Sequence, residues 1–286
     1  MSRITLTVTG DLPRTLGDFL RKEHGISAMT VRRLKNVPDG VTRRGELVRT
    51  VDDVFPGDEI CLHLPESAPH EKNFEMQIPV IYESEAVIAV NKPVDVPCHP
   101  SMLHRNDTLA NWFAAHYPED GFHLVGRLDR NTSGAVLIAK NTIAAHALPD
   151  SVRKRYYALV PAGLSGSGMI DAPLGRTAES VITRCVRPDG LPAVTEYEVI
   201  GGNEKCTLIA LRLRTGRTHQ IRVHMAYIGY PLLGDSLYGG DCTLLSEHAL
   251  HCGEITFRSP ENGQQVTVRA PLRADMRAIL GGEYDV

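Results

Sequence analysis

The chain has 286 residues, 42% of them hydrophobic and 23% charged, and its formal net charge is −3. These proportions are typical of a folded globular protein and exclude a disordered or fibrous chain. No run reaches the roughly 18 consecutive apolar residues of a membrane span, and the first residues lack the apolar core of a secretory signal, so we expect a cytoplasmic protein without membrane contact. The six cysteines form no C-x-x-C pair, which favours free thiols in a reducing compartment.

The N-terminal part has the pattern of a small α+β domain. Apolar residues recur at helical spacing within 14–20 and again within 26–34, which predicts two short helices. Segments 41–48 and 55–64 have the turn-punctuated pattern of strands. We therefore predict a first domain over residues 1–66.

A polar, proline-containing stretch separates this domain from a larger one. Residues 65–72 show no periodicity, so we place a linker at 67–75 and a second domain at 76–286. From Ile78 onward, strand signals rich in β-branched residues are dense. Helical spacing is found at 108–116, 141–148 and 218–228. Because strands and helices do not alternate regularly, we predict a mixed α+β fold rather than a doubly wound parallel sheet.

Charge is unevenly distributed along this weakly acidic chain. Residues 14–49, 127–155 and 205–222 are each rich in lysine and arginine, and the last of these tracts contains no acidic residue. Such tracts suit either a solvated surface or a face that binds an anion, and charge alone does not decide between them.

Asp129 lies between two apolar runs in the segment Leu124–Ala139, LVGRLDRNTSGAVLIA. It follows directly on a predicted strand, where a rigid element can aim a side chain. Arg127 and Arg130 flank it, and a nearby cation would keep the carboxylate ionised and available as a nucleophile. Alternatively, Asp129 only opens an Asx-turn, with both arginines in solvent.

A second polar cluster is found in residues 215–225, TGRTHQIRVHM, where a basic strand leads into a helix. Thr218 is expected to cap this helix. Its first turn then carries Arg217, His219, Gln220 and Arg222. Backbone N–H groups at a helix start favour anions, so the cluster indicates an anion site, although a capped helix with a polar outer face has the same pattern.

Five blocks resemble, in this order, the pseudouridine synthases of the RluA type: GRLDRNTSG, KRYYALV, TGRTHQIRVHM, GDSLYG and LHCGEITFRSP. The resemblance runs from about Ile78 to the C-terminus. It implies a mostly antiparallel sheet with flanking helices, and isomerisation of specific uridines to pseudouridine without a cofactor. The implied partner is a structured rRNA or tRNA stem-loop whose target nucleotide is flipped out of the stack. Residues 14–64 resemble the alpha-L RNA-binding module, with its basic helix represented only by residues 30–35.

The resemblance also assigns roles by position. The family's catalytic aspartate falls on Asp129, its active-site tyrosine on Tyr156, and the arginine that pairs with the aspartate on Arg222. Arg127 matches the arginine that occupies the space of the flipped base. The further candidate substrate contacts are Arg130, Arg217, His219 and Gln220. The chain departs from the family at Gly126 and Asp95, where many relatives have histidine and glycine.

Several alternatives stay open. Asp129 would either attack the anomeric carbon of the ribose or remove a sugar proton to give a glycal. A non-catalytic RNA-binding or ribosome-assembly protein on the same scaffold is the alternative function, and the presence of Asp129, Tyr156 and Arg222 favours the enzyme. We predict no metal site at the cysteines and histidines that lie close together in the sequence over 242–252, because they lack the spacing of a zinc ligand set. These residues are Cys242, His248, His251 and Cys252. We expect a monomer.

Overall fold

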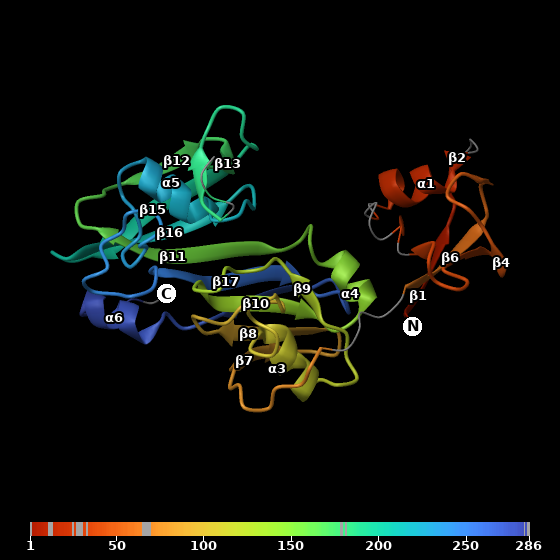
Figure 1. Cartoon of the computed structure of the whole chain (residues 1–286), viewed down its shortest axis with the longest axis horizontal. Coiled ribbons are helices and arrows are strands. Elements are labelled where there is room, and N and C mark those ends of the chain that lie inside the picture. The colour runs from red at the N-terminus through yellow and green to blue at the C-terminus, as the bar shows by residue number, and fades with distance from the viewer. Residues whose placement is uncertain are drawn as a thin grey trace. The chain divides into compact units, whose positions relative to one another are not determined.

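The structure is a computed structural model that divides the chain into two compact units, Met1–Pro69 and His70–Val286 (Figure 1). It describes residues 2–10, 14–24, 26, 31–32, 34–64, 70–177, 180, 182–282 and 284. Most of the second predicted helix, 26–34, and the segment 65–69 lie outside the described residues.

The first unit is built around a four-stranded antiparallel sheet with the order β1-β6-β3-β4. Its strands are β1 (Ser2–Thr7), β6 (Glu59–Leu64), β3 (Val41–Arg43) and β4 (Glu46–Leu47), and a separate pair is formed by β2 (Arg14–Thr15) and β5 (Asp53–Val54). Thr15 caps the short helix α1 (Leu16–Asp18) by accepting from the Asp18 N–H, and the chain continues as one π-helical turn, Phe19–Glu23. Leu16, Phe19 and Leu20 are fully buried in the core of this unit.

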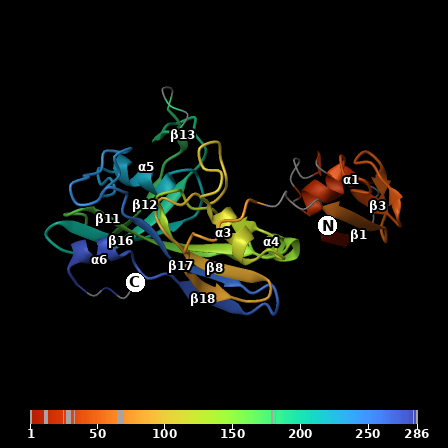
Figure 2. The ribbon, with the colours of Figure 1, turned by 60° about the horizontal axis from the view of Figure 1, so that its bottom comes forward.

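The second unit contains a ten-stranded sheet, which confirms the α+β prediction. Its main order is β12-β15-β16-β11-β17-β10-β8-β7, with β18 paired to β17 and β9 to β10 (Figure 2). The bounds are β7 (Val80–Glu83), β8 (Val87–Lys92), β9 (His123–Val125), β10 (Ser133–Ala139), β11 (Arg153–Pro161), β12 (Ser167–Asp171), β15 (Val194–Gly202), β16 (Cys206–Leu213), β17 (Leu250–Arg258) and β18 (Gln265–Arg269). Among the described strands of this sheet, every pair is antiparallel except β10 with β17.

The parallel contact between β10 and β17 depends on a glycine. Gly134 pairs with Cys252, and its φ of +107° lies in the region that glycine tolerates best. A Cβ at this position would lie 2.2 Å from the carbonyl oxygen of Cys252. The missing side chain therefore lets the two strands approach at the point where the loop before β10 ends.

Helices cover both faces of the sheet. Along β11, Tyr156 and Ala158 belong to the core that includes α5 (Gln220–Tyr227), whereas Tyr157 and Leu159 belong to the core that includes α6 (Ala274–Leu280). Successive residues of a strand point to opposite faces, so α5 and α6 lie on opposite sides of β11, as Figure 1 shows.

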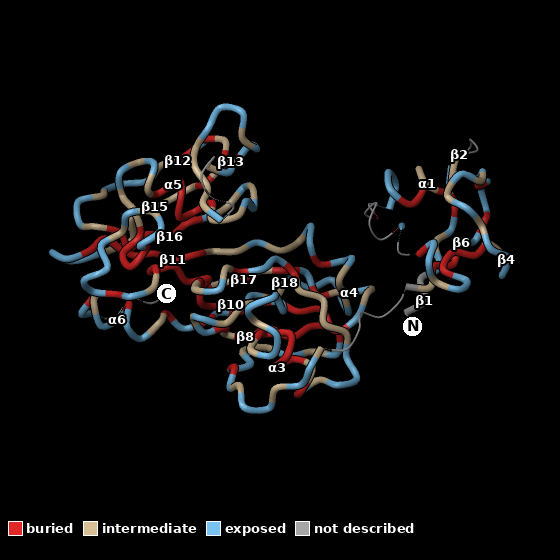
Figure 3. The backbone as a smooth tube through the Cα atoms, in the orientation of Figure 1, coloured by how far each residue is buried: buried red, intermediate tan, exposed pale blue. Residues whose placement is uncertain are grey.

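The other end of the sheet and one side hairpin complete this unit. The helices α3 (Leu109–His116) and α4 (Thr142–Ala147) lie beside β8, β9 and β10, and a small hairpin is formed by β13 (Leu174–Arg176) and β14 (Arg184–Val186). The central strands are the most buried part of the unit (Figure 3). All seven residues of β10 are buried. No helix in the described part of the chain has the length and hydropathy to cross a bilayer.

Candidate active site

The loop between β9 and β10 carries Asp129, whose side chain is 27% exposed. The Thr132 N–H donates to the Asp129 carbonyl and closes a turn. Below the loop, the fully buried Lys92 donates from Nζ to the carbonyl oxygens of Pro93, Val96 and Arg130 at 2.9, 2.8 and 2.8 Å. Burial lowers the pKa of Lys92 to about 8, which leaves the ammonium charged at neutral pH. Lys92 therefore ties the loop to the end of β8.

The Asp129 side chain borders a cleft of about 1210 Å³. The walls of the cleft come from the β9–β10 loop, β11, the end of β16 and the start of α5. Of the predicted site residues, the cleft brings together Asp129, Arg127, Tyr156, Arg217, His219, Gln220 and Arg222. Arg130 is not among its lining residues. The structure thus gathers segments that lie far apart in the sequence around one carboxylate.

The start of α5 differs from the sequence prediction. Its N-cap residue is His219, with φ of 57°, and no side chain caps the helix there. Thr218, the expected cap, instead accepts at Oγ1 from Nη2 of Arg127 at 3.3 Å. The helix begins two residues later than predicted because the chain makes a left-handed turn at His219 before it becomes helical.

Gln220 holds this turn from inside the protein. Its side-chain Oε1 accepts from the Thr215 hydroxyl and the Arg217 N–H, and its Nε2 donates to the Val194 carbonyl and the Thr195 hydroxyl. The residue is 2% exposed. Both amide hydrogens of Gln220 are used within the protein, so it has no donor left for RNA. Gln220 holds the backbone of the turn instead of making the expected substrate contact.

Arg222 does not make the predicted pair with Asp129. Its Nε and Nη2 donate to the two carboxylate oxygens of Asp235, both at 2.7 Å. Asp235 is fully buried and needs a cation, whereas Asp129 keeps solvent contact. Burial acts to lower the pKa of Arg222, but the bonds to Asp235 and the field of Asp129 outweigh it and raise the pKa. Arg222 therefore reaches Asp129 only through its electrostatic field.

Among the described contacts, the basic side chain that faces the carboxylate of Asp129 is His219. Nε2 of His219 lies 3.9 Å from Oδ2 of Asp129. The other ring nitrogen, Nδ1, lies 2.7 Å from the hydroxyl of Tyr238. Tyr238 also stacks on the guanidinium of Arg222, with 4.9 Å between the guanidinium carbon and the ring centroid.

Tyr156 lines the cleft from β11, while Tyr157 packs on the opposite face. Tyr156 is 7% exposed. Burial raises the pKa of its phenol well above the usual value, and the charges of Cys252 and Asp129 add to the effect. The phenol therefore keeps its proton at neutral pH and is not a phenolate base.

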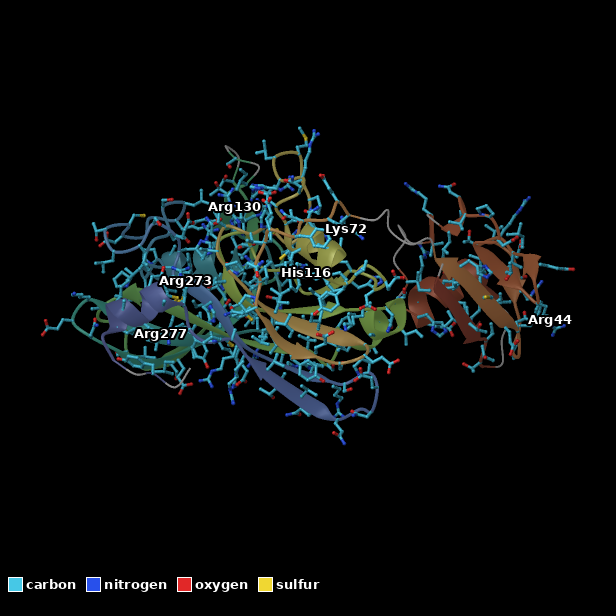
Figure 4. The ribbon with its side chains drawn as sticks, turned by 90° about the horizontal axis from the view of Figure 1, so that it is seen from below. Arg44, Lys72, His116, Arg130, Arg273 and Arg277 are labelled. Atoms are coloured by element: carbon cyan, nitrogen blue, oxygen red, sulfur yellow. The ribbon has the colours of Figure 1, made fainter. Side chains whose placement is uncertain are left out.

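Arg127 and Arg130 diverge on either side of Asp129. Arg127 is exposed and lines the cleft. Arg130, labelled in Figure 4, turns away to Asp95 and His104, with contacts of 2.7 and 3.1 Å. Asp95 has φ of 63°, a left-handed conformation that favours glycine. In this chain the carboxylate of Asp95 binds Arg130.

Comparison with known proteins decides the family. Residues 86–227 match the family model for RNA pseudouridylate synthases. An uncharacterized RNA pseudouridine synthase of Bacillus subtilis (strain 168) is 38% identical over 273 residues, which cover 91% of this chain and 96% of that protein. The chain belongs to the RNA pseudouridine synthase family. This confirms the resemblance to the RluA type, and the protein is an isomerase that acts on RNA.

Two further relatives show how far the similarity extends. A ribosomal large subunit pseudouridine synthase D of Vibrio parahaemolyticus is 34% identical over 252 residues, covering 79% of this synthase and 77% of the relative. The solved structure of human RNA pseudouridylate synthase domain containing 1 superposes with a TM-score of 0.59 at 26% identity. It covers 70% of this synthase and 86% of the human chain.

Sequence reasoning missed three residues around the site of this synthase: Lys92, Asp235 and Tyr238. Asp235 and Tyr238 belong to the GDSLYG block, which was recognised without a role for either side chain. Within the described ranges, no three His, Cys, Asp or Glu side chains are grouped as metal ligands. Both ring nitrogens of His251 have partners, the Ser133 hydroxyl at 2.9 Å and the Ala270 carbonyl at 3.2 Å.

Proposed function

We propose that this synthase isomerises specific uridines in a structured rRNA or tRNA, with Asp129 as the reacting carboxylate. One observation carries the assignment. Three carboxylates line the cleft, and two of them are bound by arginines: Glu196 by Arg214, and Glu254 by Arg269 at 3.0 Å. Asp129 instead faces a histidine at 3.9 Å and keeps 27% of its side chain exposed. It is therefore the carboxylate best placed to react with a nucleotide in the cleft.

The basic lining of the cleft supports RNA as the bound polymer. The cleft contains the side chains of Arg127, Arg153, Lys154, Arg155, Arg212, Arg214, Arg217 and Arg222. A neighbouring pocket of about 520 Å³ shares Gly216, Arg217 and Thr218 with it and adds Arg176, Arg184 and Arg187. Arg222 is held by Asp235 inside the protein, so phosphates on either side of the target nucleotide would bind along the other side chains of this set, in a contact that weakens as salt rises.

The reaction itself needs a nucleotide taken out of its stack. Extrusion costs a few kcal/mol, least for a nucleotide in a loop, and Arg127 at the rim would occupy the vacated space. Tyr156 would stack on the uracil. The bond from the anomeric carbon to N1 breaks and a bond to C5 forms, while C5 loses a proton and N1 gains one. The isomerisation is redox-neutral, so we propose no cofactor and no metal.

Asp129 would act in one of two ways. It would attack the anomeric carbon and form a covalent ester, or it would remove a sugar proton and give a glycal. In either route the cations Arg222 and Lys92 lie close enough to feel the charge of Asp129, which acts to raise the pKa of both. Tyr156, with its raised pKa, is a poor acceptor for the C5 proton at neutral pH.

The first unit is proposed to be an accessory RNA-binding domain of the alpha-L type. Its basic tract over residues 14–49 supports this role. We further propose a monomer that works in the cytoplasm. All six cysteines are free, which fits a reducing compartment.

The test is tritium release from total RNA labelled at C5 of uridine and taken from cells that lack the protein. The wild type should release tritium, and Asp129→Asn should reduce the rate at least about 100-fold. Asp150→Asn, an exposed aspartate in the same basic tract, is the matched control and should leave the rate unchanged. Filter binding of the same RNA separates a loss of chemistry from a loss of affinity. RNA binding without release by the wild type would favour the non-catalytic alternative.

A further inference from the structure

The histidine that faces Asp129 is held by a second residue of the cleft wall. Nδ1 of His219 lies 2.7 Å from the Tyr238 hydroxyl, and Nε2 points to Oδ2 of Asp129 at 3.9 Å. The two rings meet edge to face, with centroids 5.7 Å apart. His219 is therefore contacted at both nitrogens, by a phenol on one side and a carboxylate on the other.

The Tyr238 hydroxyl also contacts the backbone of β14. The Arg184 N–H donates to the Tyr238 oxygen at 3.1 Å. Because that oxygen already accepts one hydrogen bond, its own proton is available for Nδ1 of His219. Burial raises the pKa of Tyr238, so the hydroxyl keeps this proton. A neutral imidazole that accepts at Nδ1 must carry its hydrogen on Nε2.

The surroundings also keep the imidazole neutral. Burial lowers the pKa of His219; the charges of Arg222 and Arg184 act in the same direction, while Asp129 and Asp235 oppose it. His219 is the N-cap residue of α5, with a backbone φ of 57°, so its ring lies at the start of that helix.

We propose that Tyr238 is a positioning residue that fixes His219 as its Nε2–H tautomer, so that the imidazole donates this hydrogen to the carboxylate of Asp129. The proposal rests on Asp129 being the reacting carboxylate. The gap of 3.9 Å closes to a hydrogen bond when a nucleotide fills the cleft, as catalytic contacts often tighten on substrate binding. The hydrogen bond would engage Oδ2 of Asp129, orient the carboxylate and leave Oδ1 to react. No proton is transferred, so His219 stays neutral through the cycle.

Through Tyr238 and His219, the β13–β14 hairpin is connected to the reacting carboxylate by hydrogen bonds and contacts. The hairpin lines the neighbouring pocket through Arg176 and Arg184, and the Arg184 backbone supplies the hydrogen bond that orients Tyr238.

The first test measures the tautomer directly, without any RNA. Nitrogen-15 NMR of the histidine rings distinguishes Nδ1–H from Nε2–H, and the His219 signals are those that disappear in His219→Gln. The wild type should show the Nε2–H form at pH 7.5, and Tyr238→Phe should shift it toward a mixture. An Nδ1–H form in the wild type, or a pattern unchanged in Tyr238→Phe, would overturn the proposal.

The second test uses single-turnover tritium release. Tyr238→Phe should lower the rate constant about 10-fold with RNA affinity unchanged, the effect of one hydrogen bond. Tyr227→Phe, an exposed tyrosine on α5, is the matched control and should have no effect. The amide nitrogen of Gln reaches the place of Nε2, so His219→Gln should retain more activity than His219→Asn. Asparagine tolerates a positive φ at least as well as glutamine does. A lower rate in His219→Asn would therefore reflect its shorter side chain and not backbone strain.

A double variant distinguishes positioning from simple structural support. In the His219→Gln background, Tyr238→Phe should cause no further loss of rate, because there is no tautomer left to fix. Full additivity of the two substitutions would refute the proposal. The proposed function and this inference fail separately: absence of release by the wild type would remove the first, while the NMR result stands without it.

Discussion

The buried pair of Arg222 and Asp235 gives the sharpest prediction of stability. The side chains are 9% and 0% exposed and share two hydrogen bonds of 2.7 Å. Asp235→Ala removes the partner of a guanidinium that stays buried. Loss of one member of such a pair costs about 3–5 kcal/mol, because the remaining charge has no equal compensation. Urea unfolding of the full chain, followed by a probe in the second unit, should show this loss of unfolding free energy.

The chain supplies a matched control for this prediction. Arg187 and Asp189 form a pair of the same bidentate geometry, at 2.5 and 2.7 Å, but with 43% and 69% of the side chains exposed. Asp189→Ala should therefore leave the unfolding free energy almost unchanged, because solvent screens an exposed pair. Arg222→Met combined with Asp235→Leu should recover most of the stability lost in Asp235→Ala, since no charge remains buried. Equal effects of the two single substitutions, or no recovery in the double variant, would refute the reasoning.

Three further predictions concern the strand contact, acid stability and RNA affinity. Gly134→Ala should lower the melting temperature markedly, because a Cβ would lie 2.2 Å from a backbone oxygen, whereas Gly163→Ala, at a similar φ of +109° in open space, should pay only the backbone strain and lower it less. Burial lowers the pKa of His248 to about 3 and that of His251 to about 4, both below the unfolded value near 6.5. The unfolded state therefore binds more protons, and the unfolding free energy falls as pH falls below 6.5, by about 2 kcal/mol for each histidine between pH 7 and pH 5. Urea titrations that coincide at the two pH values would contradict this. Arg127→Ala should reduce the salt dependence of RNA binding by about one unit of slope if that side chain meets a phosphate, which filter binding across a salt series measures; an unchanged slope would exclude the contact.

The sequence predicted those features that depend on local pattern. The apolar spacing over 218–228 located α5 within two residues of its start. Dense strand signals without regular helices between them led to the α+β fold, since periodicity and turn residues are written in neighbouring positions.

Partners chosen by burial were not predictable in the same way. Arg222 binds Asp235 rather than Asp129 because the fully buried carboxylate has the greater need of a cation, and burial of each is known only from the packed structure. The same holds for Gln220, whose four hydrogen bonds consume an amide that seemed available to a substrate. Thr218 had the right chemistry for a cap, but the left-handed turn at His219 moved the helix start past it.

The contact between Gly134 and Cys252 also bears on when a newly made chain becomes active. The Asp129 loop precedes β10 directly, and β10 is held on one side by β8 and on the other by β17, whose strand starts only at Leu250. Pairing across such a separation in sequence forms late in folding, because the intervening chain must first be brought together. During synthesis the cleft stays incomplete until β17 (Leu250–Arg258) has emerged. The basic segments over residues 14–49 and 127–155 are therefore made well before the strand that completes the cleft.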